Sequence, residues 1–292
     1  MGTQFLALGH EFSSEDKASW IIIPVPFDAT TCYRPGARFG PQAIIDASCQ
    51  MELFDEELLS EPFRHGIHTR SPVEPLIDPK EMALNVEEVV ASILSGGKRV
   101  CVLGGDHSIS IGAIEAAKRV YGKINLVQFD AHLDLRENYQ GSPYSHACVM
   151  RRVWDGTNPI QVGIRSYSRE EYDFLVGQDR LPLTAYSVRQ DLEGTTLELA
   201  RRLEAALPTY VTIDLDCLDP SIMPAVGTPE PGGLNWFDLL SLLRTITRTT
   251  TVIGFDCVEL APVPGLNHPE YTASRLVYKM IGYCSHGRDR DA

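Results

Sequence analysis

The sequence lacks the long apolar runs and the paired cysteines that mark two large classes of protein. No stretch approaches the roughly 18 consecutive apolar residues of a membrane-spanning helix. The first ten residues have neither a basic start nor a sustained apolar run, so we expect no secretory signal peptide. The seven cysteines are an odd number without paired spacing, which argues against a disulfide framework. We therefore expect a cytoplasmic protein that does not bind membranes.

Basic residues are also scarce. The chain has 26 lysines and arginines against 39 aspartates and glutamates, for a net charge of −13. This balance disfavours nucleic acid and anionic membranes as partners and is compatible with a cationic ligand.

No Ser/Gly-rich linker, charge block or internal repeat interrupts the chain. We therefore expect a single domain over residues 1–292, with a core over about 20–283 and a polar tail over 286–292.

The sequence does contain short apolar segments that alternate with amphipathic ones. Strands are predicted over 20–27, 100–103, 124–130, 160–164, 210–216 and 251–255. Helices are predicted from Pro41, over 81–95, 109–121, 169–176, 198–207 and 272–282, and after Asn235, which forms a capping box with Asp238. This alternation predicts an α/β protein: a three-layer α/β/α sandwich with a mainly parallel central sheet.

Four apolar segments run directly into acids and histidines, namely 100–107, 124–134, 210–216 and 251–259. In a parallel α/β sheet, ligands gather at the carboxyl ends of the strands. Alternate residues of a strand also point to one side, so acids two apart share a face if the strand geometry persists. The pattern predicts that one point is surrounded by His107, Asp130, His132, Asp134, Asp214 and Asp216.

Such a set of side chains predicts a binuclear metal site. Several carboxylates placed after buried strands are costly without compensation, and surface solvation explains them poorly. Four ionised aspartates balance two divalent cations, and a bridging hydroxide would leave the cluster slightly negative, which suits a cationic guanidinium. Carboxylates with imidazoles indicate manganese, whereas thiolates would indicate zinc or copper. Two such ions lower the pKa of a shared water and create a nucleophile at neutral pH.

Three segments of the chain resemble the ureohydrolase family, the relatives of arginase and agmatinase. They are Gly104-Gly-Asp-His-Ser108, Asp130-Ala-His-Leu-Asp134 and Thr212-Ile-Asp-Leu-Asp-Cys-Leu-Asp-Pro220. Weaker similarities lie at Arg34–Arg38, Gly227–Gly233 and Val258–Pro262, and the resemblance extends from Ile21 to Tyr283. The motifs are specific as a set, because each follows a predicted strand in the expected order.

The resemblance implies the arginase/deacetylase type of three-layer fold and two Mn²⁺ ions per subunit. One ion would be held by His107, Asp130, Asp134 and Asp214, and the other by Asp130, His132, Asp214 and Asp216. A metal-bridging hydroxide would attack the guanidinium carbon, and the tetrahedral intermediate would collapse to urea and an amine. His146 matches the family's proton-shuttle histidine, and Glu259 matches the acid that pairs with the substrate guanidinium.

Considered alone, His146 could be a loop histidine and Glu259 a buried acid paired with an arginine. Their positions favour catalysis or substrate binding, since His146 follows Asp134 by twelve residues and Glu259 ends the fourth acidic segment. Three further acids are expected to support the site from outside it. Asp106 and Asp256 would orient metal ligands, and Asp219 would hold its loop by accepting backbone amides.

The resemblance also implies a class of substrate. Tyr144-Ser-His-Ala147 is similar to the agmatinase pattern Tyr-Ser-His-Gly, and the arginase stretch that grips an α-amino acid is absent. Agmatine is the expected substrate, giving putrescine and urea. N1-aminopropylagmatine is the nearest alternative, followed by guanidinobutyrate, guanidine and arginine. Ala147 replaces the usual glycine and Cys148 follows it, so the pocket beside His146 is expected to differ in shape.

Two other functions compete with this interpretation. A deacetylase-type amidohydrolase would use one zinc ion and a tandem His-His pair, and the sequence contains no such dipeptide. A catalytically silent relative would lack one or more ligands, yet all six are present. The expected partner is thus a small cationic guanidino compound, and the resemblance implies a homo-oligomer, either a trimer or a hexamer.

Overall fold

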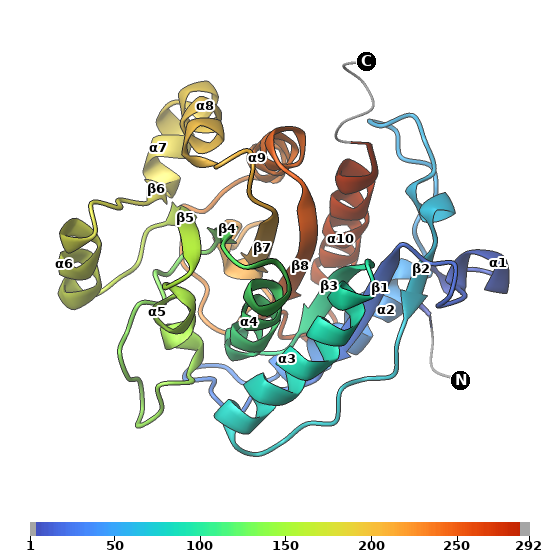
Figure 1. The fold of residues 1–292 in the computed structure, drawn as a ribbon, viewed down its shortest axis with the longest axis horizontal. Helices are drawn as coiled ribbons and strands as arrows, with labels where there is room; N and C mark the ends of the chain where they lie inside the picture. The colour runs from blue at the N-terminus through green and yellow to red at the C-terminus, as the bar shows by residue number, and fades with distance from the viewer. Residues whose placement is uncertain (1–3, 287–292) are drawn as a thin grey trace.

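The computed structural model describes residues 4–286, and its centre is a sheet of eight parallel strands (Figure 1). Neighbouring strands follow the order β2-β1-β3-β8-β7-β4-β5-β6, and each pair is parallel. This confirms the predicted parallel sheet. The strands are β1 (Trp20–Val25), β2 (Ile67–Thr69), β3 (Arg99–Gly104), β4 (Ile124–Phe129), β5 (Thr157–Ile164), β6 (Leu183–Thr184), β7 (Thr209–Asp214) and β8 (Val252–Val258).

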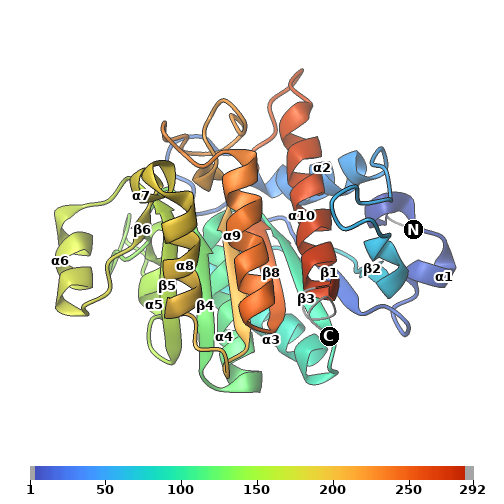
Figure 2. The same ribbon diagram turned by 90° about the horizontal axis from the view of Figure 1, so that it is seen from above.

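Helices cover both faces of this sheet, which confirms the three-layer sandwich. Figure 2 shows α8, α9 and α10 side by side on one face, with α3 and α4 behind the strands. Buried residues of α2 and α7 join the first face, and those of α5 join the second. The helices are α1 (His10–Ser13), α2 (Gly40–Ser48), α3 (Pro79–Ser95), α4 (Ser110–Tyr121), α5 (Val149–Val153), α6 (Arg169–Gly177), α7 (Ala185–Gln190), α8 (Leu192–Arg202), α9 (Trp236–Thr249) and α10 (His268–His286).

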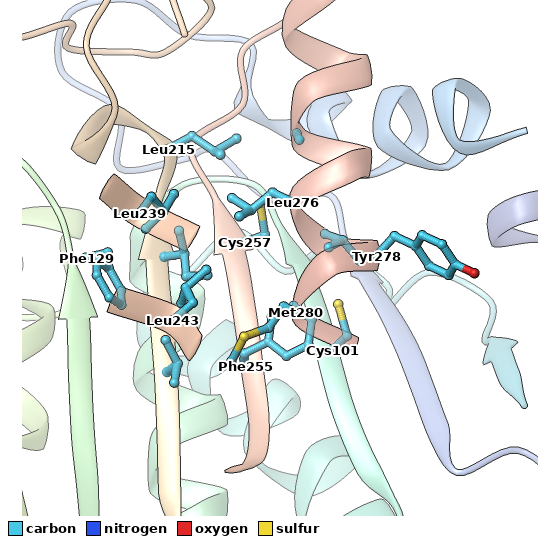
Figure 3. Packing of buried hydrophobic residues seen from close by; sticks show 14 of the residues in the cluster. Cys101, Phe129, Leu215, Leu239, Leu243, Phe255, Cys257, Leu276, Tyr278 and Met280 are labelled. Atoms are coloured by element: carbon cyan, nitrogen blue, oxygen red, sulfur yellow. The ribbon is translucent and has the colours of Figure 1, made fainter. Parts of the chain in front are cut away.

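The strands contribute to two hydrophobic layers because their side chains alternate. In β1, Trp20 and Ile22 pack into one layer, whereas Ile21 and Ile23 pack into the other. Both faces of a parallel sheet are therefore buried, as the continuous apolar runs indicate. Figure 3 shows the layer beneath α9 and α10, with labelled side chains Cys101, Phe129, Leu215, Leu239, Leu243, Phe255, Cys257, Leu276, Tyr278 and Met280.

One predicted helix is displaced along the chain. The expected helix over 198–207 is α8, which begins earlier because Asp191 caps it by accepting the Gly194 N–H at 2.8 Å. It ends at Arg202 because the following segment binds the sheet: the Asn125 side-chain amide donates to the carbonyls of Glu204 at 2.9 Å and Leu207 at 3.2 Å. Apart from His286, the tail expected over 286–292 lies outside the described residues.

The strand order explains why the four acidic segments meet. They follow β3, β4, β7 and β8, which occupy adjacent positions in the sheet in the order β3-β8-β7-β4. Because all four strands are parallel, their carboxyl ends lie at the same edge. Within residues 4–286, no helix is both long and apolar enough to cross a membrane.

Candidate functional site

The predicted site residues lie at the carboxyl edge of the sheet, but mostly in the turns beyond the strands. β4 ends at Phe129 and β7 ends at Asp214, before the later acids of each segment. Asp134 has a positive φ of 52°, and Asp216 lies in the 3₁₀ turn Leu215–Cys217. The prediction that strand alternation aligns these acids is therefore wrong. The turns that follow the strands bring them together.

Three carboxylates surround one ring nitrogen of His107. Its Nδ1 atom lies 3.2 Å from an oxygen of Asp130, 3.0 Å from Asp134 and 3.4 Å from Asp214. The residue is 1% exposed, and among the described residues Nδ1 has no hydrogen-bond partner. A buried ring nitrogen without a partner that faces carboxylate oxygens is well placed to share a cation with them.

A second group forms beside the first. The Nδ1 atom of His132 lies 3.0 Å from Asp216 and 3.6 Å from Asp130. The donor atoms of His107, Asp130 and Asp134 lie within 4.8 Å of one another, as do those of Asp130, His132 and Asp216, so Asp130 belongs to both groups. Asp214 contacts His107 but belongs to neither group, so its bridging role stays a prediction.

Burial and crowding shift the pKa values of these carboxylates. Burial, and then the charge of Asp130, raise the pKa of Asp134 to about 7. Burial, and then Asp216 and Asp130, also raise the pKa of Asp214. Burial acts in the same direction on Asp130, but the adjacent rings of His107 and His132 hold its pKa below the ordinary value. Full ionisation of the cluster therefore requires added positive charge, which divalent cations supply.

Buried hydrogen bonds orient His107 from behind. Its Nε2 atom lies 2.8 Å from the Thr212 hydroxyl, which in turn donates to Asp256 at 2.7 Å. With Nε2 carrying the hydrogen, the neutral ring presents a lone pair at Nδ1 to the carboxylates. Asp256 is fully buried and acts through Thr212 on the ring. Sequence reasoning missed Thr212, although it precedes Asp214 by two residues on the same strand.

A similar chain supports Asp130. The Gln161 amide donates to Gln128 at 2.6 Å, and the Gln128 amide donates to Asp130 at 2.7 Å. The two glutamines are register partners in β4 and β5, and both are buried. These residues were also missed. For Gln128 the signal was a polar side chain in an apolar strand, two residues before a candidate ligand, as for Thr212, whereas Gln161 gives no such signal.

Glu259 lies at the end of β8 and reaches the turn after β3. Its carboxylate accepts the His107 N–H at 2.7 Å, and its own N–H donates to Gly105 O at 2.8 Å. Burial, and then the nearby Asp106, raise the pKa of Glu259. Asp106 itself is fully buried and accepts N–H groups from Ser108 at 3.0 Å and Thr30 at 2.9 Å. It thereby holds the turn that carries His107.

His146 lies in a separate loop of the same pocket. Its backbone N–H donates to the Thr30 hydroxyl at 3.0 Å, and its Nδ1 atom lies 3.3 Å from the hydroxyls of Thr30 and Ser145. The ring of Tyr139 packs edge-on against it, with centroids 5.5 Å apart. Burial lowers the pKa of His146, which favours the neutral ring that can exchange a proton.

The remaining predicted residues have visible roles in the surrounding loops. Asp219 accepts the N–H groups of Ser221, Gly232 and Gly233 at 3.0, 2.9 and 3.3 Å, so it ties together the loop between β7 and α9. Ala147 follows His146 in a 3₁₀ turn and is not among the residues with positive φ. Alanine therefore fits there without strain. Cys148 is buried, lies 3.8 Å from Ser142 O through its Sγ atom, and is not among the residues that line the pocket.

The two predicted catalytic residues and four of the six ligand candidates line one pocket of about 330 Å³. It is formed by loops that follow β1, β3, β4, β5, β7 and β8. The lining includes the ligand candidates His107, His132, Asp134 and Asp214, together with His146, Glu259 and the rim residues Tyr33, Arg136, Tyr139 and Tyr167. Tyr33 is 77% exposed, so its ring stands at the mouth.

The donor set fits divalent cations. Four carboxylates and two imidazoles converge, no thiolate from residues 4–286 joins them, and the unpartnered Nδ1 of His107 faces the carboxylate oxygens. Oxygen-rich sites of this kind suit Mg²⁺, Ca²⁺ or Mn²⁺, and the imidazoles shift the balance toward a transition metal. The ligands therefore fit a cation pair that shares Asp130.

Comparison with known proteins agrees with this geometry. Residues 18–282 match the model of the arginase family. An N(1)-aminopropylagmatine ureohydrolase from Synechocystis sp. is 37% identical over 96% of this chain and 93% of its own, and an agmatinase from Bacillus subtilis is 34% identical over 96% of both. The crystal structure of an agmatine ureohydrolase from Thermoplasma volcanium superimposes with a TM-score of 0.87 at 30% identity, over 98% of this chain and 95% of the other. With the matched motifs all lying at the carboxyl edge of the sheet, the chain belongs to the arginase family.

Proposed function

We propose that this protein hydrolyses a guanidino amine to urea and a primary amine. Water adds to the guanidinium carbon, the bond from that carbon to the substituted nitrogen breaks, and this nitrogen leaves as the amine with one added proton. The observation that carries the proposal is the convergence of two histidines and four aspartates at one edge of the sheet, where His107, His132, Asp134, Asp214 and Glu259 line a single pocket. Family membership supports it, as do two relatives, an N(1)-aminopropylagmatine ureohydrolase and an agmatinase.

The cofactor in this proposal is a pair of Mn²⁺ ions. His107, Asp130, Asp134 and Asp214 would hold one, and Asp130, His132, Asp214 and Asp216 would hold the other, as the family resemblance implies. When bound, two such cations lower the pKa of a shared water and so make a nucleophile available at neutral pH. The shared Asp130, which belongs to both donor groups, supports this division.

The chain's own side chains would orient the substrate and move the proton. Glu259 would pair with the guanidinium, because a buried carboxylate whose pKa is raised by burial gains most from a permanent cation. His146 would deliver a proton to the departing nitrogen. Its Nδ1 edge faces the hydroxyls of Thr30 and Ser145, which leaves Nε2 for the substrate.

Agmatine and N1-aminopropylagmatine are the two leading substrates. The sequence favours agmatine, and the agmatinase from Bacillus subtilis supports it. Four relatives from Synechocystis, Thermus and Thermococcus, 35–38% identical, carry the name N(1)-aminopropylagmatine ureohydrolase and support the longer amine equally. The exposed ring of Tyr33 at the mouth is compatible with either, since an aromatic face binds an ammonium group.

One feature of the pocket favours a different guanidino compound. Arg136 lines the pocket and places its guanidinium 5.2 Å from the centre of the Tyr139 ring. Among the described residues, no carboxylate forms an ion pair with Arg136. A free guanidinium repels a distal ammonium and attracts a carboxylate. Guanidinobutyrate is therefore the third candidate, after the two guanidino amines.

A substrate panel tests these alternatives. The purified protein, supplied with Mn²⁺, would be assayed for urea release from agmatine, N1-aminopropylagmatine, guanidinobutyrate, arginine and guanidine. The expected result is the highest kcat/KM for one of the two guanidino amines. If the Arg136 guanidinium repels the distal ammonium, Arg136→Gln should raise kcat/KM for the two guanidino amines. If it binds the carboxylate of guanidinobutyrate, the same substitution should lower kcat/KM for that compound alone. Failure to release urea from every compound would refute the proposed function.

We also propose a homo-oligomer, a trimer or a hexamer, as the resemblance implies. Large apolar side chains remain exposed on the adjacent helices α7, α8 and α9, namely those of Tyr186, Leu197 and Phe237. Light scattering coupled to size-exclusion chromatography would measure the assembly, and a monomer at micromolar concentration would contradict it.

A further inference from the structure

A residue from the other side of the pocket holds His146. Thr30 lies in the loop after β1, 116 positions away from His146 in the sequence, and it is 9% exposed. Its hydroxyl accepts the His146 N–H at 3.0 Å and lies 3.3 Å from Nδ1 of the same residue. One hydroxyl therefore contacts both the main chain and the ring of the histidine.

Thr30 is itself fixed by a buried acid. Its N–H donates to Asp106 at 2.9 Å, and Asp106 is fully buried at the start of the His107 turn. The loop after β1, the turn after β3 and the loop after β4 thus meet at this threonine. A displacement of Thr30 would move His146 relative to the turn that carries His107.

The Nδ1 and Nε2 edges of the His146 imidazole have different surroundings. Nδ1 faces the hydroxyls of Thr30 and Ser145, whereas among residues 4–286 no group forms a hydrogen bond with Nε2. The edge of the Tyr139 ring packs against the imidazole. The hydroxyls therefore anchor one edge of the ring and leave the other edge to the pocket, which His146 lines.

We propose that Thr30 is a positioning residue for the proton transfer by His146. Its hydroxyl fixes the backbone of His146 and the rotation of the ring, so that Nε2 is held toward the departing nitrogen. Proton transfer requires this control, because donor and acceptor must approach to about 2.6–3.2 Å in the reacting complex. This inference rests on the proposed function, since it assigns a role in that reaction.

Two substitutions at position 30 separate positioning from packing. Thr30→Val keeps the shape of the side chain and removes the hydroxyl, whereas Thr30→Ser keeps the hydroxyl and removes a methyl group. We expect Thr30→Val to lower kcat by roughly 10–100-fold, part of the general acid–base contribution of about 10²–10⁴-fold. KM and manganese content should stay near the wild-type values. Thr30→Ser should recover kcat to within about three-fold.

The pH dependence of kcat provides a readout that a packing defect would not change. A hydrogen bond to the ring acts differently on its two protonation states, so Thr30→Val should shift the profile and Thr30→Ser should overlay the wild type. Thr247→Val is the matched control: its residue is buried on α9, and within the described part of the chain its hydroxyl bonds only to the Arg244 carbonyl, at 3.1 Å. It should leave both kcat and the profile unchanged.

The results distinguish this inference from the proposed function. If the wild type releases urea and Thr30→Val matches it in kcat and pH profile, the positioning role is refuted and the activity stands. If Thr30→Ser is as impaired as Thr30→Val, the methyl group matters and the hydroxyl does not, which also refutes the role. If the wild type itself releases no urea from any guanidino compound, the proposed function fails first.

Discussion

The hydroxyl of Thr212 should control metal affinity without touching the metal. It lies 2.8 Å from Nε2 of His107 and donates to Asp256 at 2.7 Å, and all three residues are buried. Thr212→Val keeps the shape of the side chain but leaves the His107 ring N–H without its partner, and the Asp256 oxygen keeps only the longer hydrogen bond from the Ile213 N–H, at 3.3 Å. The ring would then lose the contact that keeps its hydrogen on Nε2 and its lone pair toward the carboxylates.

The magnitude follows from two estimates. Leaving a buried polar group unsatisfied costs about 1–3 kcal/mol, and losing the support of a metal ligand weakens metal affinity by about 10–100-fold. The latter corresponds to about 1.4–2.7 kcal/mol, so the two estimates agree. We expect the Kd for Mn²⁺ to rise by about 10–100-fold, and the metal-free protein to lose about 1–3 kcal/mol of its free energy of unfolding.

Equilibrium dialysis with elemental analysis would measure the Kd, and urea denaturation would measure stability. Thr212→Ser should behave as the wild type. Thr209→Val is a matched control on the same strand: its buried hydroxyl pairs with Thr250 at 2.6 Å, away from the site, so it should destabilise the fold and spare metal binding. The reasoning is refuted if Thr212→Val keeps the wild-type Kd, or if Thr209→Val weakens it equally.

Three further substitutions test other parts of the structure. Asp130→Ala removes the carboxylate common to both donor groups, so elemental analysis should find neither metal retained. Gly105→Ala places a methyl group 1.6 Å from the Phe27 carbonyl oxygen, so we expect loss of the folded state by circular dichroism. Asp55→Ala removes a fully buried partner that lies 2.9 Å from the Lys279 ammonium, and should lower the free energy of unfolding by about 3 kcal/mol in a denaturant titration.

Each of these variants has a control with the same chemistry. Asp173→Ala removes an exposed aspartate and should keep both metals. Gly177→Ala adds a methyl group where no atom lies within 4 Å, and should fold normally. Asp46→Ala removes a solvent-exposed acid and should change stability by less than about 0.5 kcal/mol. The corresponding argument would be contradicted if a control variant lost its metals, its fold or its stability. It would also be contradicted if a test variant kept the property that it is expected to lose.

The sequence was sufficient to predict which strand ends form the site. Strands of a buried parallel sheet have continuous apolar sequences, so the acids and histidines that follow them are easily recognised in the sequence. The short edge strands β2 and β6 could not be predicted, because three and two residues carry no periodic pattern. The strand order β3-β8-β7-β4 could not be predicted from the sequence either, since it depends on pairing between segments that are distant along the chain.

The contacts that orient the site were harder to predict than its ligands. Gln128 and Thr212 could have been found, because each lies two residues before an aspartate and so points to the same side of its strand. Thr30 gives no such signal. It meets His146 only because the loops after β1 and β4 fold over the same edge, an outcome of tertiary structure and not of local sequence.

The backbone of Glu259 shows a conflict between local preference and site geometry. Its φ is 68°, a left-handed conformation that costs a non-glycine residue about 1–3 kcal/mol. The contacts with Gly105 O and the His107 N–H hold it there. No sequence rule predicts a glutamate in this conformation, since local preference alone would place glycine at such a position.

Comparing two truncations of Glu259 measures this strain. Both Glu259→Gly and Glu259→Ala remove the carboxylate, but glycine adopts a positive φ without the steric cost that alanine has, so the glycine variant should be more stable than the alanine variant by about 1 kcal/mol. At Thr250, where φ is −136°, the order should reverse, because glycine loses more entropy on folding. Urea denaturation of the metal-free proteins would give all four values. If alanine is the more stable at both positions, the end of β8 is relaxed, and the contacts from β3 are not required to hold the carboxylate in the pocket.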